Sequence, residues 1–250
     1  MKIAFEVAGT GHPLLLVSGI GQVGKRWRRV VAELQDEYTC VTVDNRGVGA
    51  TGLPDEPFTV GEMAQDALDT MRDLGHERFF LAGISMGGMI SQEIVRIGGS
   101  ARVRAAVLLA TAAGASTAAF GSFATLFAGQ DDPRPAWAKL AGPGFYEEHP
   151  DVIDEETQLS VDAAVNPMAY LRQGEAIQGW DPPEDSLRAS GVPIVVAHGN
   201  ADPLVPYENG VIVAERAGVD LVTYDGAGHV LESERVKEIC DLMRSHFSAH

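Results

Sequence analysis

The stretch Phe79–Ile97, FFLAGISMGGMISQEIVRI, decides the fold: an apolar run, a glycine-rich turn and a helix-period segment follow one another. The turn Gly83–Gly87 has the pattern G-x-S-x-G with Ser85 at its centre. Such a turn is so sharp that the serine is strained and bulkier neighbours would clash. It lifts the serine oxygen clear of the sheet and directs the N–H of Met86, at the helix start, toward the same point. A glycine-rich turn with a serine cap is the simpler interpretation, but the strand-before, helix-after context favours a nucleophile.

Short apolar runs and helix-period segments alternate along the whole chain. Most runs are continuously apolar, which is typical of strands buried on both faces of a parallel sheet. One intervening segment, Val60–Leu74, has its apolar residues on one helical face. This order predicts an α/β protein with a doubly wound, mostly parallel sheet, in which ligands bind at the carboxyl ends of the strands. The runs are Ile3–Val7, Leu14–Val17, Thr39–Val43, Phe79–Ala82, Ala105–Leu109, Ile194–Ala197 and Leu221–Tyr224.

A serine nucleophile needs a histidine base and an acid that orients it, and both follow later strands. His229 comes after the last run, on a loop rich in glycine, and Asp202 comes after the run before it. The order is therefore Ser85, Asp202 and His229, with intervals of 117 and 27 residues. Serine, acid and histidine in this chain order are typical of one fold, with room for an insertion in the long first interval.

Two nearby residues could take these roles instead, and a basic run could contact the substrate. His198 lies at a strand end and is expected to be a packed or hydrogen-bonded histidine rather than the base. Asp225 is nearer to His229 in sequence, but it precedes a glycine turn and is expected to be a turn residue. The basic run Lys25–Arg29 is expected to form a solvated helix face, with contact to an anionic substrate group as the alternative.

Three further segments carry a family resemblance. Ser18–Gly21 ends the second run, Asp44–Gly49 has the pattern D-x-R-G-x-G, and Gly199–Asp202 has the pattern G-x-x-D. Together with the serine turn, they make the chain resemble serine hydrolases of the α/β-hydrolase fold over nearly its whole length outside residues 113–190. The resemblance implies an oxyanion hole made by the backbone N–H groups of Ile20 and Met86. Ser18 stands where the family commonly has histidine.

The long gap after the Ala105–Leu109 run is expected to be an insertion. The resemblance implies a helical cap after the sixth strand, here residues 113–190, on a core of residues 1–112 and 191–250. Aromatic residues are abundant in this segment, and some are expected to wall an apolar substrate pocket above the serine. We therefore expect a medium-sized apolar ester or lactone as substrate. The candidate pocket residues are Phe120, Phe123, Phe127, Trp137, Tyr146 and Trp180.

Two resemblances bear on the substrate and disagree. Gly83–Gln92 and Val107–Ala113 are similar to 3-oxoadipate enol-lactonases and to cofactor-free haloperoxidase-type esterases. Ser18–Gly21 is more similar to ring-cleavage hydrolases. A carboxylester or lactone hydrolase with an acyl-enzyme on Ser85 is the leading hypothesis. The alternatives are a perhydrolase or C–C bond hydrolase, a cyclase or lyase that uses His229 as base, and a ligand-binding module without catalysis.

The net charge of the chain limits the classes of partner that we expect. The chain has 250 residues with 35 acidic and 19 basic side chains, a net charge of −16. Such a surface repels nucleic acid and anionic membranes. Residues 113–190 hold thirteen acidic and four basic side chains, a net −9 over the expected site, which favours neutral or cationic substrates.

The sequence also leads to expectations about membrane spans, cellular location and cofactors. The uncharged stretch Ala105–Gly129 is expected to be a buried strand, a loop and a helix rather than a membrane span. The first residues show no signal-peptide pattern and there are two cysteines, so we expect a cytoplasmic protein. The proposed chemistry requires no cofactor, and no metal-ligand spacing is present. The sequence does not indicate an oligomeric state.

Overall fold

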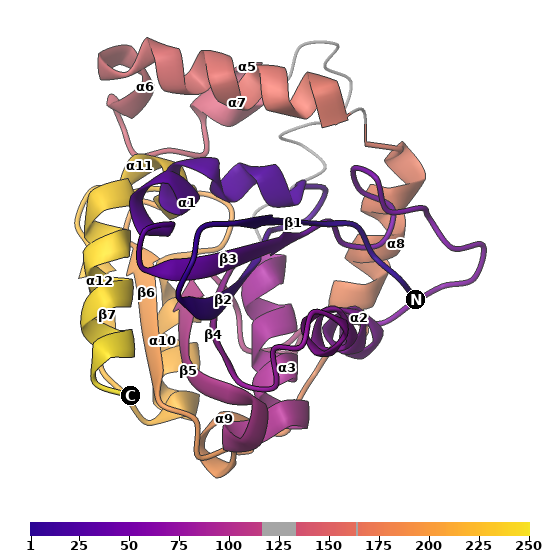
Figure 1. Ribbon diagram of the computed structural model, residues 1–250. Helices are drawn as coiled ribbons and strands as arrows, with labels where there is room; N and C mark the ends of the chain where they lie inside the picture. Colours follow the sequence, from indigo (N-terminus) through magenta and orange to yellow (C-terminus); the bar gives the residue numbers. More distant parts are fainter. Residues whose placement is uncertain (117–133, 164) are drawn as a thin grey trace.

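A computed structural model describes residues 1–116, 134–163 and 165–250. Its centre is a seven-stranded sheet in the order β1-β3-β2-β4-β5-β6-β7 (Figure 1). Each of the seven predicted runs overlaps a strand, and β2 to β7 are parallel to one another. The strands are β1 (Phe5–Ala8), β2 (His12–Val17), β3 (Tyr38–Val43), β4 (Phe79–Ile84), β5 (Val103–Leu109), β6 (Ile194–Gly199) and β7 (Leu221–Tyr224).

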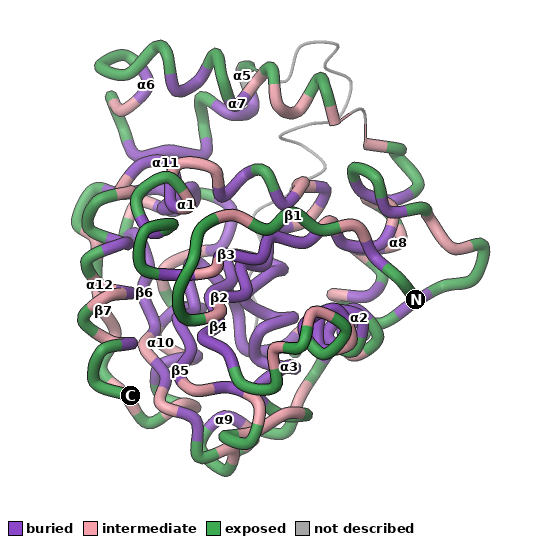
Figure 2. The backbone as a smooth tube through the Cα atoms, viewed as in Figure 1, coloured by how far each residue is buried: buried purple, intermediate pink, exposed green. Residues whose placement is uncertain are grey.

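Helices cover both faces of the sheet, as a doubly wound fold requires. Leu14 and Leu16 of β2 pack toward α1 (Arg28–Leu34) and α12 (Val236–Ser248). Leu15 and Val17 pack on the other face, where the core includes α2 (Val60–Asp73), α3 (Met86–Arg102) and α10 (Tyr207–Ala217). Figure 2 shows the central strands buried. Two-sided burial explains why these runs are continuously apolar.

The first strand departs from this pattern. β1 pairs antiparallel with β3 at the edge of the sheet, and three of its four residues are exposed. An antiparallel edge strand can face water, so this run needs no second apolar face.

Helix α2 begins at its predicted first residue, Val60, where a capping box precedes it. The side chain of Thr59 accepts a hydrogen bond from the N–H of Glu62, and the Glu62 carboxylate accepts one from the N–H of Thr59. This reciprocal capping box satisfies two N–H groups that the first turn leaves free. Its apolar stripe then packs on α3 and the sheet.

The segment between β5 and β6 is helical where it is described. It contains α5 (Arg134–Ala138), α6 (Phe145–Glu148), α7 (Pro150–Ala163), α8 (Pro167–Gln178) and α9 (Ser186–Ala189). In Figure 1, α5 to α7 lie at the top of the view, above α1 and α11 (Leu231–Glu234). α9 instead packs against α3 and α10. The segment follows the fifth strand of this sheet, one fewer than the resemblance led us to expect.

The uncharged stretch that begins in β5 was expected not to span a membrane. None of the helices in the described ranges has the length and apolar character that a bilayer crossing needs.

Candidate active site

Ser85 sits on a strained turn between β4 and α3. Its backbone has φ 58° and ψ −126°, a conformation that non-glycine residues rarely adopt. A Cβ on Gly83 would clash with the carbonyl of Gly87, and one on Gly87 would clash with the carbonyl of Val17. The two glycines are therefore required by close backbone packing, as the sequence pattern predicted.

Hydrogen bonds to β5 and the residues after it hold this turn. The Ser85 N–H donates to the carbonyl of Leu109 at 3.0 Å, and the hydroxyl of Thr111 donates to the carbonyl of Ser85 at 2.7 Å. Both Thr111 and Ser85 are buried. Sequence reasoning missed Thr111, although its position just past the carboxyl end of a predicted strand was a usable signal.

Asp202 and His229 lie together. One carboxylate oxygen of Asp202, Oδ2, is 2.7 Å from Nδ1 of His229. The other, Oδ1, accepts the N–H groups of Leu204 and Val205 at 2.8 and 2.9 Å. The two backbone bonds fix the carboxylate, so that it in turn fixes the imidazole ring.

His198 is a buried neighbour of this pair, in line with its expected packed role. Its Nε2 lies 2.8 Å from the carbonyl of Val205 and 3.2 Å from Oδ2 of Asp202. A Cβ on Gly210 would clash with the imidazole, so the ring is held on its other side as well. His198 therefore acts on His229 only through the carboxylate that they share.

The pair shifts the pKa of each partner in opposite directions. Burial alone would raise the pKa of Asp202, but the charge of His229 and hydrogen bonds from both histidines lower it well below the usual range. Burial alone would lower the pKa of His229, but the charge and hydrogen bond of Asp202 raise it above its ordinary value. Asp202 therefore stays ionised and favours the imidazolium form of His229.

The segment after α5 holds the loop that carries His229. The N–H of His229 donates to the carbonyl of Leu140 at 2.6 Å. The buried carboxylate of Glu234 accepts the N–H of Gly142 at 3.2 Å and that of Gly228 at 2.8 Å. Burial raises the pKa of Glu234 more than these hydrogen bonds lower it. Sequence reasoning missed this connection, because it joins residues far apart in the chain.

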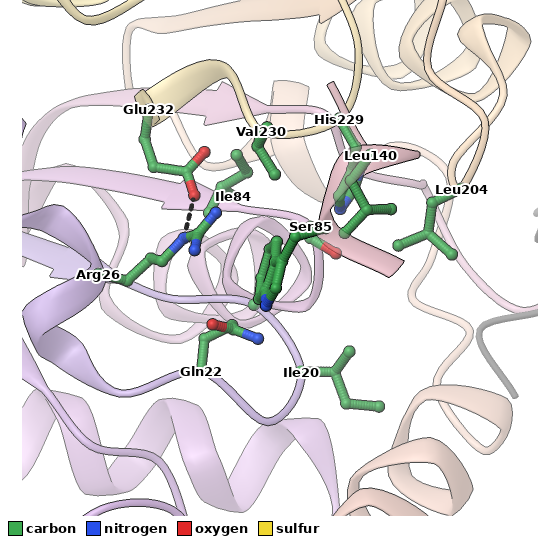
Figure 3. Close-up of a pocket in the computed structure, with 12 residues that line it drawn as sticks. Ile20, Gln22, Arg26, Ile84, Ser85, Leu140, Leu204, His229, Val230 and Glu232 are labelled. Atoms are coloured by element: carbon green, nitrogen blue, oxygen red, sulfur yellow. Dashed lines mark hydrogen bonds and ion pairs between the residues drawn. The ribbon is translucent and has the colours of Figure 1, made fainter. Parts of the chain in front are cut away.

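Ser85 and His229 line one pocket at the carboxyl ends of the strands (Figure 3). Ile20, in the loop after β2, is also part of the lining. Within the described ranges, the N–H groups of Ile20 and Met86 donate to no other residue. The pocket wall is mixed, with apolar and charged side chains. The other lining residues are Gly19, Gln22, Arg26, Ile84, Trp137, Leu140, Leu204, Val230 and Glu232.

Comparison with known proteins decides the family. The model of the alpha/beta hydrolase family matches residues 14–242, most of the chain. The protein belongs to the alpha/beta hydrolase family. It is therefore a hydrolase, and the family resemblance and fold class inferred from the sequence are confirmed.

Individual relatives are named for different activities. A putative non-heme haloperoxidase of Mycobacterium phage D29 is 29% identical over 236 residues, 90% of this chain and 84% of that protein. The 3-oxoadipate enol-lactonase 2 of Acinetobacter baylyi is 26% identical over 227 residues, 89% of this chain and 83% of the lactonase. The enol-lactonase structure of Burkholderia xenovorans LB400 has a TM-score of 0.84 at 21% identity, covering 99% of this chain and 96% of that one.

Of the candidate aromatic residues that the structure describes, the hydrolase brings Trp137 to the pocket wall. Trp137 lines it, and its indole N–H donates to Ser160 at 2.8 Å. Tyr146 is buried nearby, while Trp180 lies apart from the described lining and its indole donates to Glu93 at 3.4 Å. The remaining candidates, Phe120, Phe123 and Phe127, lie outside the described residues.

The basic run of the hydrolase is not the solvated face that we expected. Arg28 and Arg29 pair with Glu155 of α7 at 2.9 and 2.7 Å, which ties α1 to the helices beyond it. Arg26 is buried and lines the pocket. The run therefore neutralises acidic residues of the 113–190 segment and reaches the site through one side chain.

The loop Asp44–Gly49, with the pattern D-x-R-G-x-G, contacts the chain next to the site rather than the pocket itself. Asp44 accepts the N–H of Gly24 at 2.8 Å and that of Ala50 at 3.0 Å, so it joins its own turn to the 3₁₀ helix η1 (Gly24–Trp27). Arg46 instead pairs with Asp66 of α2 at 2.6 Å. The motif thus holds the loop after β2 in place and takes no part in lining the pocket.

Proposed function

We propose that this hydrolase cleaves a carboxylic ester or lactone through an acyl-enzyme on Ser85. One observation carries the proposal: a serine on a strained strand–helix turn lines the same pocket as a histidine whose Nδ1 lies 2.7 Å from a buried carboxylate. Nucleophile, base and orienting acid in this relation are the minimum that serine acyl transfer needs.

The residues take their roles from their positions. His229 removes the proton from Ser85 as the oxygen attacks the carbonyl carbon. Asp202 keeps the Nδ1 proton in place and stabilises the imidazolium that forms. The N–H groups of Ile20 and Met86 receive the oxyanion, and each such donor is typically worth about 3 kcal/mol in the transition state. Water, activated by the same histidine, then hydrolyses the acyl-enzyme.

Part of the pocket wall supports an apolar substrate. Ile20, Ile84 and Leu140, with other apolar side chains, form part of its wall. The lactonase from Acinetobacter baylyi is a full-length relative and makes lactones a reasonable class to test. The acidic residues of the 113–190 segment outnumber the arginines of the basic run that pair with them, and the remaining negative charge weighs against anionic esters.

A labelling and turnover experiment tests the proposal. The protein is treated with a fluorophosphonate and with p-nitrophenyl esters of increasing acyl chain length, alongside Ser85→Ala and His229→Ala. We expect labelling at Ser85, turnover of the esters, and loss of both in Ser85→Ala. Absence of labelling and turnover in the wild type would refute the serine hydrolase. Activity that survives Ser85→Ala but not His229→Ala would favour a lyase or cyclase that uses His229 alone as base.

A further inference from the structure

The wall of the pocket contains a buried ion-pair cluster that the proposed acyl transfer does not use. Arg26, from η1, is 1% exposed and lines the pocket together with Ser85. Its Nη1 pairs with Glu156 of α7, and its Nε donates to Oε1 of Glu232 of α11 at 3.0 Å. Its guanidinium lies 4.0 Å from the ring centre of Trp137. The arginine is therefore fixed from three sides.

One edge of this arginine is only half used. The Nε and Nη2 groups of a guanidinium form a fork that matches the two oxygens of a carboxylate. Here only Oε1 of Glu232 accepts a hydrogen bond from this edge, and the donor is Nε of Arg26 (Figure 3). Neither Nη2 of Arg26 nor Oε2 of Glu232 has a hydrogen-bond partner within the described ranges. A buried charged donor and acceptor left in this state are costly, and a ligand that satisfies both recovers that cost.

The charges around this edge select a neutral ligand. The cluster around this edge contains three positive and three negative side chains, which balance: Arg26, Arg28, Arg29, Glu155, Glu156 and Glu232. A carboxylate placed on Nη2 would satisfy the arginine but would meet the free oxygen of Glu232. An ammonium group would satisfy the glutamate but would meet the arginine. A hydroxyl satisfies both, because its oxygen accepts one hydrogen bond and its proton is donated in another.

We propose that Arg26 and Glu232 form a polar subsite that binds a hydroxyl group of the substrate, remote from the carbonyl that Ser85 attacks. Nη2 of Arg26 donates to the hydroxyl oxygen, and Oε2 of Glu232 accepts the hydroxyl proton. This inference rests on the proposed function for the identity of the attacked group. It makes the preferred substrate a hydroxylated apolar ester or lactone.

Matched substrates test the subsite in the unmodified protein. The set consists of p-nitrophenyl esters of ω-hydroxyalkanoic acids over a range of chain lengths. Each is paired with its ω-methyl, ω-methoxy and ω-carboxylate counterpart. At the length that reaches the subsite, we expect kcat/KM for the hydroxy ester to exceed that of the methyl ester by about tenfold or more. A ratio near one at every length, or a preference for the methoxy or carboxylate ester, overturns the subsite.

A paired substitution connects the ratio to its residues. Glu232→Gln keeps the shape but turns the free acceptor into a donor, so an ether oxygen is then accepted as well as a hydroxyl and we expect the hydroxy-to-methoxy ratio to fall to about one. Glu155→Gln on α7 makes the same change of charge at a half-exposed carboxylate away from the pocket, and we expect it to keep the wild-type ratio. An unchanged ratio in Glu232→Gln, with the protein folded by thermal melting, would assign the preference elsewhere.

Binding separates this inference from the proposed function. Calorimetric titration of Ser85→Ala with the corresponding ω-hydroxy and ω-methyl primary amides needs no turnover. Ester cleavage without a hydroxyl preference leaves the hydrolase and removes the subsite. Tighter binding of the hydroxy amide by about tenfold, without any ester cleavage by the wild type, leaves the subsite and removes the serine hydrolase. If the protein shows neither ester cleavage nor a difference in binding between the two amides, both the subsite and the serine hydrolase are removed.

Discussion

Replacing Asp202 by asparagine tests the charge relation on which the proposed mechanism depends. Asparagine keeps the side-chain shape, and its oxygen can still accept the N–H groups of Leu204 and Val205. The amide NH₂ then takes the place of Oδ2, which lies 2.7 Å from Nδ1 of His229 and 3.2 Å from Nε2 of His198. Nδ1 of His229 must therefore become an acceptor, which puts the proton on Nε2.

A histidine in this tautomer cannot remove a proton from Ser85. The expected loss in kcat is about 10⁴-fold, or ~5 kcal/mol in the barrier. The Nε2–H of His198 also loses a carboxylate partner, which is expected to lower the free energy of unfolding by about 1–3 kcal/mol. The kinetic loss is thus larger than the stability loss, and the two are measured separately.

The assay follows turnover of the best p-nitrophenyl ester, with thermal unfolding measured on the same samples. Asp225→Asn is the matched control, because Asp225 is the rival acid nearest to His229 in sequence and is bonded at an exposed site to Asn200. We expect Asp225→Asn to keep near-wild-type kcat. If a folded Asp202→Asn retains more than a tenth of the wild-type kcat, or Asp225→Asn is the inactive variant, the assignment of the acid is wrong.

Three further predictions concern the segment after α5, the pH profile and salt. Gly142→Ala should lower both stability and kcat, because its Cβ would clash with the carbonyl of Gly226. The control Gly174→Ala lies in a helix with open space around the new Cβ, and it should raise stability by about 0.5–1 kcal/mol without a kinetic effect. Thermal melting and ester turnover measure both variants. The raised pKa of His229 should put the midpoint of the acid limb of kcat/KM above 6.5, because the imidazolium, which dominates below the raised value, cannot accept the serine proton; a limb below 6.5 contradicts this. Added salt should raise kcat/KM for anionic esters and leave neutral esters unchanged, because it screens the net −9 of residues 113–190; anions preferred at low salt would overturn the argument.

The parallel part of the sheet and the positions of Ser85, Asp202 and His229 could be predicted because their signals are local. An apolar run of the right length reports a buried strand, and a glycine pattern reports a sharp turn. β1 shows the limit of this reasoning, since its residues carry strand propensity but not their place at an antiparallel edge.

Long-range pairing accounts for what the sequence did not indicate. Arg26 stands in a run of basic residues that favours a solvated surface, yet carboxylates 130 and 206 positions away in the chain make its burial possible. Likewise, nothing local marks Glu234 as the link between Gly142 and Gly228. Such contacts depend on how the segment after α5 docks, which composition and periodicity do not encode.

The bond between Leu140 and His229 has a consequence for substrate binding. Because the backbone N–H of His229 donates to the carbonyl of Leu140 at 2.6 Å, moving the Leu140–Gly142 stretch away from the sheet breaks one of the hydrogen bonds that hold the loop of the base. The position of this stretch and the position of the imidazole are therefore energetically coupled. A bound molecule that holds the stretch against the sheet would stabilise the base in the same step.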